Sequence, residues 1–217
     1  DAAPFMQLME QSVAVLENHP VNQARKAAGK RPANSAWFWG EGKRPNLALF
    51  SEKYGLQGSV VSAVDLIRGI GRLAGMRVAQ VGGATGYIDT NFAGKAQAAL
   101  QELQQGQDFV YIHVEAPDEC GHRGEIQNKV RAIELIDQQI LGPVLEGLRQ
   151  YDHYKILIMP DHPTPLSVRT HTADPVPFMI YDSKQFRDGA AFSEENASAT
   201  GNFIENSLEL MPLFLNK

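Results

Sequence analysis

Cysteine is almost absent from this chain of 217 residues, which contains only Cys120. A single thiol excludes an internal disulfide and suits a reducing compartment, so we expect a cytoplasmic protein. No apolar run approaches the roughly 20 residues that a membrane-spanning helix requires. Basic runs are also short, with nothing longer than "GKR", and the formal net charge is −5. We therefore expect neither a membrane nor a nucleic acid as a partner.

An initiator methionine is also missing, because the chain opens on Asp1 at the edge of a predicted helix, "PFMQLMEQSVAVLENH". From this start we expect a piece of a longer protein. Internal repeats and low-complexity tracts are absent too. The hydrophobic fraction of 43% is ordinary for a globular chain, and it suffices for one core or for a core with a small additional lobe.

Helices and strands are predicted to alternate along most of the chain. β-Branched and apolar runs indicate strands, whereas apolar residues at three- and four-residue steps, from Ile126 to Val144, indicate an amphipathic helix that ends near Arg149. A polar connector is predicted at 20–34. The predicted strands are 58–64, 77–81, 108–116, 154–159 and 177–182, and further helices are predicted at 65–76 and at 92–105, the latter capped by Thr90 or Asn91. Strand, long helix and strand form a βαβ unit, so strands 108–116 and 154–159 should be parallel and adjacent or nearly so. We predict an α/β fold with a mainly parallel sheet flanked by helices.

Acids and imidazoles follow two of these predicted strands. Asp118 and His122 lie in "APDECGH", after one strand, and Asp161 and His162 follow the other in "MPDHPTPLSVRTHTADPVPF", where His171 returns on the Pro-rich loop. Ligand sites in open α/β sheets form beyond the carboxyl ends of the strands, so we expect these five side chains to converge in loops at one edge. Carboxylates and imidazoles together bind Mn²⁺, Zn²⁺ or Fe²⁺, and a metal would offset the cost of burying charge.

Some of these polar residues have a simpler interpretation. An isolated aspartate or histidine is usually a capping or surface residue, and this remains the alternative for the five. We interpret His113 as a packed, hydrogen-bonded strand residue, Cys120 as a packing residue and Asp174 as a turn residue. His19 and His153 lie in polar surroundings and are interpreted as surface residues.

The metal-ligand motifs carry a resemblance to a known family. "HPVNQARKAAGKRPANSAWFWGEGKRPNL", "GATGYIDT", "HVEAPDECGH" and "PDHPTP…RTHTADPVPF" resemble the alkaline phosphatase-like metalloenzymes, and most closely the archaeal type of cofactor-independent phosphoglycerate mutase, with its relatives proposed as homoserine kinases. The resemblance implies a glycolytic isomerase that converts 3-phosphoglycerate to 2-phosphoglycerate through a phospho-Ser or phospho-Thr intermediate at a two-metal site. Mn²⁺ is the expected metal, with Zn²⁺, Co²⁺ or Mg²⁺ as alternatives.

The resemblance also assigns residues and domains. It implies that Asp118, His122 and His171 hold one metal and that Asp161 and His162 hold the other. Lys43 and Arg44 of "GEGKRP", together with Arg68, are candidates to bind the acidic substrate, with a solvated surface charge as the alternative for each. Residues 1–50 would be a remnant of the inserted substrate or lid domain and its connector, and residues 51–217 the C-terminal part of the metal-binding domain.

One element of the family pattern is missing from this sequence. No Asp-Gly strand end or nucleophilic Ser/Thr motif precedes residue 110, so we expect the C-terminal half of the enzyme, with an incomplete sheet. Alone, such a chain should be inactive and could self-associate. A homoserine kinase, a phosphomonoester hydrolase and a non-catalytic metal-binding chain remain the alternatives to a mutase.

Overall fold

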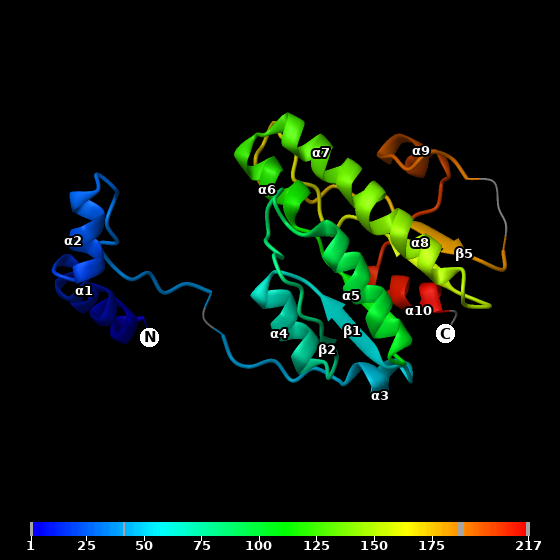
Figure 1. The fold of residues 1–217 in the computed structure, drawn as a ribbon, viewed down its shortest axis with the longest axis horizontal. Coiled ribbons are helices and arrows are strands. Elements are labelled where there is room, and N and C mark those ends of the chain that lie inside the picture. The colour runs from blue at the N-terminus through cyan, green and yellow to red at the C-terminus, as the bar shows by residue number, and fades with distance from the viewer. Residues whose placement is uncertain (1, 41, 186–188, 216–217) are drawn as a thin grey trace. The chain divides into compact units, whose positions relative to one another are not determined.

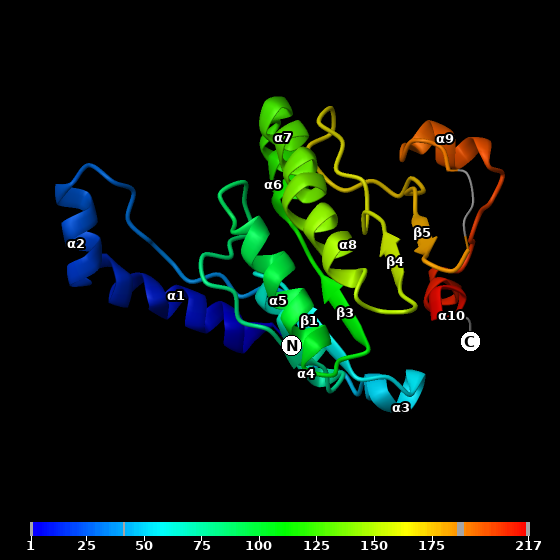
Figure 2. The same ribbon diagram turned by 45° about the vertical axis from the view of Figure 1, so that its right-hand side comes forward.

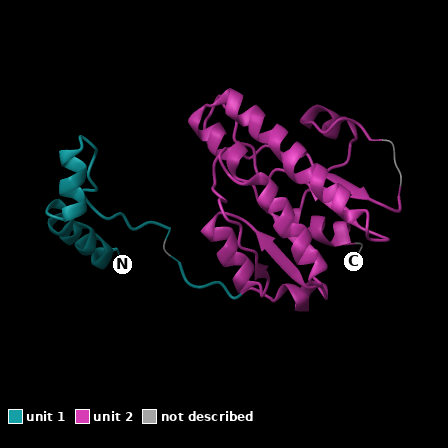
Figure 3. Cartoon of the chain, viewed as in Figure 1, with its two compact units in different colours: residues 1–46 teal, residues 47–217 magenta. Residues whose placement is uncertain are grey.

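The chain divides into two compact units in the computed structural model, which describes residues 2–40, 42–185 and 189–215. The first unit comprises residues 1–46 and the second residues 47–217 (Figure 3). The five candidate ligands all belong to the second unit, whereas Lys43 and Arg44 belong to the first.

The first unit contains a helical pair, α1 (Ala3–Glu17) and α2 (Pro20–Ala27). Helix α2 corrects the prediction of a connector over 20–34. Its start is set by His19, whose extended backbone precedes a proline and whose ring nitrogen accepts a hydrogen bond from a backbone N–H of the first turn. The buried amide of Asn22 then donates to backbone carbonyls on both sides of α2, which holds the pair together.

The second unit is built on a parallel sheet, as predicted. Its strands are β1 (Gly58–Val61), β2 (Arg77–Val78) and β3 (Phe109–Ile112), in the order β2-β1-β3. Val60 of the central strand lies opposite Val78 on one side and Tyr111 on the other, in parallel register. Figure 1 shows β1 with helices α4 (Asp65–Leu73) and α5 (Phe92–Gln104) beside it. All four residues of β1 are buried, as expected for the central strand of a parallel sheet.

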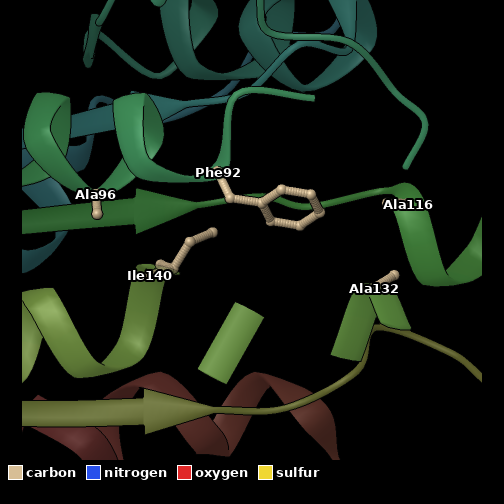
Figure 4. Close-up of a cluster of buried hydrophobic side chains, with 5 residues drawn as sticks. All are labelled: Phe92, Ala96, Ala116, Ala132 and Ile140. Atoms are coloured by element: carbon tan, nitrogen blue, oxygen red, sulfur yellow. The ribbon is translucent and has the colours of Figure 1, made fainter. Parts of the chain in front are cut away.

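The last two strands form a separate ladder. β4 (Lys155–Ile158) pairs with β5 (Met179–Asp182) in antiparallel register. Within the described residues β4 makes no ladder with β3. The two strands were predicted to be parallel and adjacent or nearly so, but in this part of the chain they are not paired with each other and belong to different ladders. Figure 4 shows β3 and β4 pointing in the same direction, so their carboxyl ends still face one edge.

Helices cover the parallel sheet and extend beyond it. They are α3 (Phe50–Tyr54), α4 (Asp65–Leu73), α5 (Phe92–Gln104), α6 (Ala116–Arg123), α7 (Ile126–Ile136), α8 (Gly142–Leu148), α9 (Glu194–Ala199) and α10 (Leu210–Leu215), with a 3₁₀ turn at Ser207–Glu209. α4 packs on β1 and β2, and α5 packs on β1 and β3 (Figure 2). Asn91 caps α5 by accepting a hydrogen bond from the backbone N–H of Gly94, which selects it from the two predicted caps.

The predicted amphipathic helix from 126 to 149 is interrupted by a π turn. α7 and α8 are joined by Asp137–Leu141, where the N–H of Gly142 donates to the carbonyl of Asp137, five residues back. The reason lies in Pro143, which has no N–H and whose ring would collide with the carbonyl four residues earlier in a regular α-helix. A wider turn relieves this collision, as is common for π segments within helices.

A hydrophobic cluster anchors the helices that carry the candidate ligands. Its buried members are Phe92, Ala96, Ala116, Ala132 and Ile140 (Figure 4). Three of the five are alanines, so the backbones of α5, α6 and α7 can approach one another closely. Ala116 is the first residue of α6, and its burial therefore fixes the position of that helix against the core. Among the described residues, no helix is long and apolar enough to span a membrane.

Candidate metal centre

Asp118 and His122 lie on one face of helix α6, not in a loop as the sequence prediction placed them. Pro117 stands in the first turn, where its missing N–H costs nothing, and the acids of that turn favour the positive end of the helix dipole. Gly124 ends the helix with φ 70°, in the left-handed region. Because residues four apart share a helix face, the Asp-x-x-x-His spacing presents both side chains in the same direction.

His171 completes a compact group of donors with these two residues. Its Nε2 lies 3.3 Å from Asp118 Oδ1 and 3.1 Å from His122 Nε2, and His122 Nε2 lies 3.4 Å from Asp118 Oδ2. Tetrahedral ligands at about 2.1 Å from a metal are about 3.4 Å from one another. The spacing of this group therefore fits a shared divalent cation, and its donor chemistry fits Mn²⁺ or Zn²⁺.

Asp161 and His162 lie immediately beside this group. The rings of His162 and His171 have centroids 3.6 Å apart, and His162 Nε2 lies 3.5 Å from Asp161 Oδ2. The structure thus brings all five sequence-predicted residues together at the carboxyl edge of β3 and β4. Asp161 is the most exposed of the five, with 59% of its side chain accessible, so its carboxylate is free to face a ligand.

The orientation of His122 is set by the loop that follows β4. Its Nδ1 lies 3.0 Å from the backbone carbonyl of Arg169, which can only accept a hydrogen bond. The ring proton therefore resides on Nδ1, and Nε2 keeps a lone pair that faces Asp118 and His171. Metal-binding histidines are commonly held in this manner. Arg169 adopts φ 57°, a left-handed conformation that is uncommon outside glycine and that turns the loop toward α6.

His113 is packed and hydrogen-bonded, as predicted, and it also faces the candidate site. Its Nδ1 lies 3.4 Å from Ser62 Oγ, and its Nε2 lies 4.0 Å from Asp161 Oδ2. Burial lowers the pKa of His113, against the opposing influence of Asp161, so the neutral ring is favoured. Sequence reasoning did not connect His113 with the second pair of ligands.

Lys95 and Glu115 are polar residues at this edge that the sequence analysis did not consider. Lys95 is only 1% exposed, and its Nζ donates to the carbonyl of His113 over 3.2 Å. Burial lowers the pKa of Lys95 to about 8, although the charge of Glu115 acts in the opposite direction. Burial, together with the nearby acids Glu119 and Asp118, raises the pKa of Glu115. Lys95 could have been noticed from the sequence, because it is a charged residue on the apolar face of the helix predicted at 92–105.

Of the three candidate substrate-binding cations, Arg68 belongs to the unit of the metal-ligand group, and no contact among the described residues joins it to that group. Arg68 lies on α4, where its guanidinium pairs with Asp65 at 3.1 Å and donates to Gln80 at 3.2 Å. Lys43 and Arg44 are exposed residues of the first unit, and Glu41 of the same "GEGKRP" stretch lies outside the described residues. A substrate-binding role for the three cations stays a prediction.

The residues that were set aside in the sequence analysis occupy ordinary positions. Cys120 is fully buried inside α6, consistent with packing, and Asp174 is exposed in the loop before β5. His153 lies 2.9 Å from Asp182 and is partly exposed.

Comparisons with known proteins bear on the family and the fold of this chain. A family model described as "Metalloenzyme superfamily" matches residues 2–213. A probable 2,3-bisphosphoglycerate-independent phosphoglycerate mutase of Geobacter sulfurreducens is 48% identical over all of this chain, which covers 54% of that protein. A 2,3-bisphosphoglycerate-independent phosphoglycerate mutase of Methanosarcina mazei is 50% identical over 90% of this chain and is itself covered to 50%. The chain therefore spans about half the length of the curated relatives it matches.

Two solved structures show the same fold. A protein from Pyrococcus horikoshii superposes with a TM-score of 0.80 at 30% identity, over 99% of this chain and 57% of the other. A cofactor-independent phosphoglycerate mutase from Thermoplasma acidophilum gives a TM-score of 0.57 at 24% identity, over 96% of this chain and 49% of the other. At this identity the second likeness concerns the fold alone.

Proposed function

This chain belongs to the metalloenzyme superfamily, and from this membership we propose that it forms the metal-binding half of a 2,3-bisphosphoglycerate-independent phosphoglycerate mutase. The observation that carries the proposal is the group formed by Asp118, His122 and His171, whose donor atoms are separated by 3.1–3.4 Å. The names of the curated relatives supply the reaction, an exchange of a phosphoryl group between two hydroxyls of glycerate.

In this proposal the five residues hold two divalent ions. Asp118, His122 and His171 hold one ion, and Asp161 and His162 contribute to the other, with Mn²⁺ as the expected metal. Bound ions would supply positive charge that stabilises the attacking and leaving oxygens of phosphoryl transfer. The protein contributes the geometry, since the tautomer of His122 is set by the carbonyl of Arg169.

The remaining residues of the proposal bind substrate and exclude water. Arg68 is the candidate cation of the second unit, and its guanidinium pairs with Asp65, donates to Gln80 and retains 27% exposure. A guanidinium suits a carboxylate or a phosphate because it binds both oxygens at once. Lys43 and Arg44 remain the other candidate cations, and we assign residues 1–50, which contain them, to a remnant of the inserted substrate or lid domain and its connector. The buried thiol of Cys120 suits a cytoplasmic enzyme.

The Ser or Thr nucleophile of the proposed reaction would come from a segment that this chain does not contain. The test therefore joins the 217 residues to the part of the Geobacter sulfurreducens relative that they do not match. This joined protein should convert 3-phosphoglycerate to 2-phosphoglycerate in an enolase-coupled assay that depends on Mn²⁺.

Substitution at the proposed ligands makes the test specific. Asp118→Asn and His171→Ala should each lower kcat by about two orders of magnitude or more, because each removes a proposed metal ligand. Asp174→Asn changes an exposed acid of the loop that carries His171 and should leave kcat unchanged. Full activity of the two ligand variants, or release of free phosphate in place of isomerisation, would contradict the proposal.

A further inference from the structure

Thr164 occupies a central position between the two candidate metal sites. It lies two residues after His162 on the loop that follows β4, and it is 5% exposed. Its hydroxyl makes a close hydrogen bond to Asp118 Oδ1 of α6, and the same oxygen lies 3.4 Å from His162 Nδ1. One buried hydroxyl therefore contacts a proposed ligand from each site.

The donors and acceptors around this hydroxyl can be assigned from chemistry. A threonine hydroxyl carries one proton, and an ionised carboxylate can only accept, so Thr164 donates to Asp118. The oxygen is left to accept, and the ring of His162 must then carry its proton on Nδ1. This tautomer places the lone pair of His162 on Nε2, which lies 3.5 Å from Asp161 Oδ2. The hydroxyl thus orients the carboxylate of the first site and selects the metal-binding nitrogen of the second.

The backbone of Thr164 is fixed by Lys129 of α7. Lys129 Nζ donates to the carbonyl of Thr164 and to that of Pro117 in the first turn of α6, each at 3.0 Å. Gly121 of α6 allows this close approach, because a Cβ at that position would lie 2.6 Å from the Thr164 carbonyl oxygen. One ammonium group therefore locks the loop to the helix that carries Asp118 and His122.

We propose that Thr164 is a positioning residue for both metal sites, held in place by Lys129. This inference rests on the proposed metal-binding function, which supplies the two ions whose ligands the hydroxyl would organise. Removal of the hydroxyl should weaken both sites together, because Asp118 loses its donor and His162 loses the acceptor that fixes its tautomer. Partners of metal ligands of this kind typically contribute about 10- to 100-fold to metal affinity.

The test compares three conservative substitutions. Thr164→Val removes the hydroxyl and keeps the volume, and Thr164→Ser keeps the hydroxyl. Thr172→Val is the matched control, since Thr172 lies on the same loop and its buried hydroxyl has no hydrogen-bond partner within the described part of the chain. Calorimetric titration of the 217-residue chain with Mn²⁺ should show affinity lowered about 10- to 100-fold in Thr164→Val, and near the parent value in the other two variants.

A second measurement separates a shared bridge from an effect on one site. In the joined protein described above, Thr164→Val should weaken both Mn²⁺ equivalents, and excess Mn²⁺ should restore most of the lost turnover. Weakening of one equivalent alone, or equal weakening by Thr164→Ser, would overturn the inference. If Thr164→Val does not fold, as judged by circular dichroism, Lys129→Met against Lys129→Arg replaces it, with loss of affinity expected only for the methionine.

Failure of this inference differs from failure of the proposed function. If the parent chain binds Mn²⁺ with an affinity that Asp118→Asn lowers, but Thr164→Val matches the parent, then only the positioning role is wrong. If the parent chain shows no Mn²⁺ binding that depends on Asp118, the metal-binding function and the inference fall together.

Discussion

The free energy of unfolding of this chain should rise with pH in the alkaline range, and replacement of Lys95 by methionine should remove this rise. Lys95 is 1% exposed and donates a hydrogen bond to the carbonyl of His113. Its pKa is lowered from 10.5 to about 8 because burial disfavours the ammonium. Between these two values the unfolded chain binds more protons than the folded chain. The free energy of unfolding must therefore rise as pH increases through this window.

The magnitude follows from the two pKa values. With values of about 8 folded and 10.5 unfolded, linkage gives a gain of about 2 kcal/mol between pH 8 and pH 10. The opposing charge of Glu115 is already included in the lowered value. Residual contact of the ammonium with water would reduce the gain, so we expect about 1–2 kcal/mol.

Urea denaturation at pH 8, 9 and 10 gives the free energies of unfolding of the parent and Lys95→Met chains. The gain is the change with pH in the difference between these two free energies. The parent should gain stability relative to the variant as pH rises. Lys30→Met, at an exposed lysine of the first unit, serves as the control and should show a constant difference from the parent. A difference between parent and Lys95→Met that stays constant, or that falls with pH, would refute the assignment of a neutralised buried lysine.

Three further predictions concern close packing and charge. Gly121→Ala should lower the free energy of unfolding by about 1–3 kcal/mol and weaken Mn²⁺ binding, because the added methyl would meet the carbonyl of Thr164 at 2.6 Å; unchanged values for both would refute the close approach. On α4, Gly69→Ala should stabilise the chain by up to about 1 kcal/mol, as nothing lies within 4 Å of the new methyl. Gly71→Ala should destabilise it, since the methyl would lie 2.7 Å from a valine of β1; thermal unfolding of the pair tests this contrast. Arg68→Ala in the joined protein should raise KM for 3-phosphoglycerate with little change in kcat. An unchanged KM would mean that Arg68 is a solvated surface charge and does not bind the substrate.

The convergence of Asp118, His122, Asp161 and His162 could be predicted from chain order, whereas the position of His171 depends on how the Pro-rich loop folds back. Strand, helix and strand bring two carboxyl ends to one edge, whatever the packing between them. The helix that carries Asp118 was missed because the prediction extended the strand and assigned a loop to what followed. The signal was present, since a proline with two acids is typical of a first helical turn.

Other features depend on tertiary contacts that no local pattern contains. β4 pairs with β5, and this choice of partner is decided by how the Pro-rich loop folds back. No local pattern singles out Thr164, because its contacts arise from the approach of α6 and α7 to its hydroxyl and its carbonyl. Lys95 could have been noticed as a charge on an apolar helix face, but its partner is a backbone carbonyl, which leaves no trace in the sequence.

The π turn at Asp137–Leu141 sets the angular phase between the two halves of the long helix. Each residue added to or removed from a helix rotates everything beyond it by about 100°. In the present phase, Lys129 on one half reaches the loop after β4, while Gly147 on the other half packs against Leu100 of α5. Deletion of one residue from the turn would rotate one half of the helix relative to the other, so that only one of these two contacts could be kept. The π turn thus sets the rotation between α7 and α8. With this rotation α8 packs on the core while α7 contacts the loop beside the metal-ligand group.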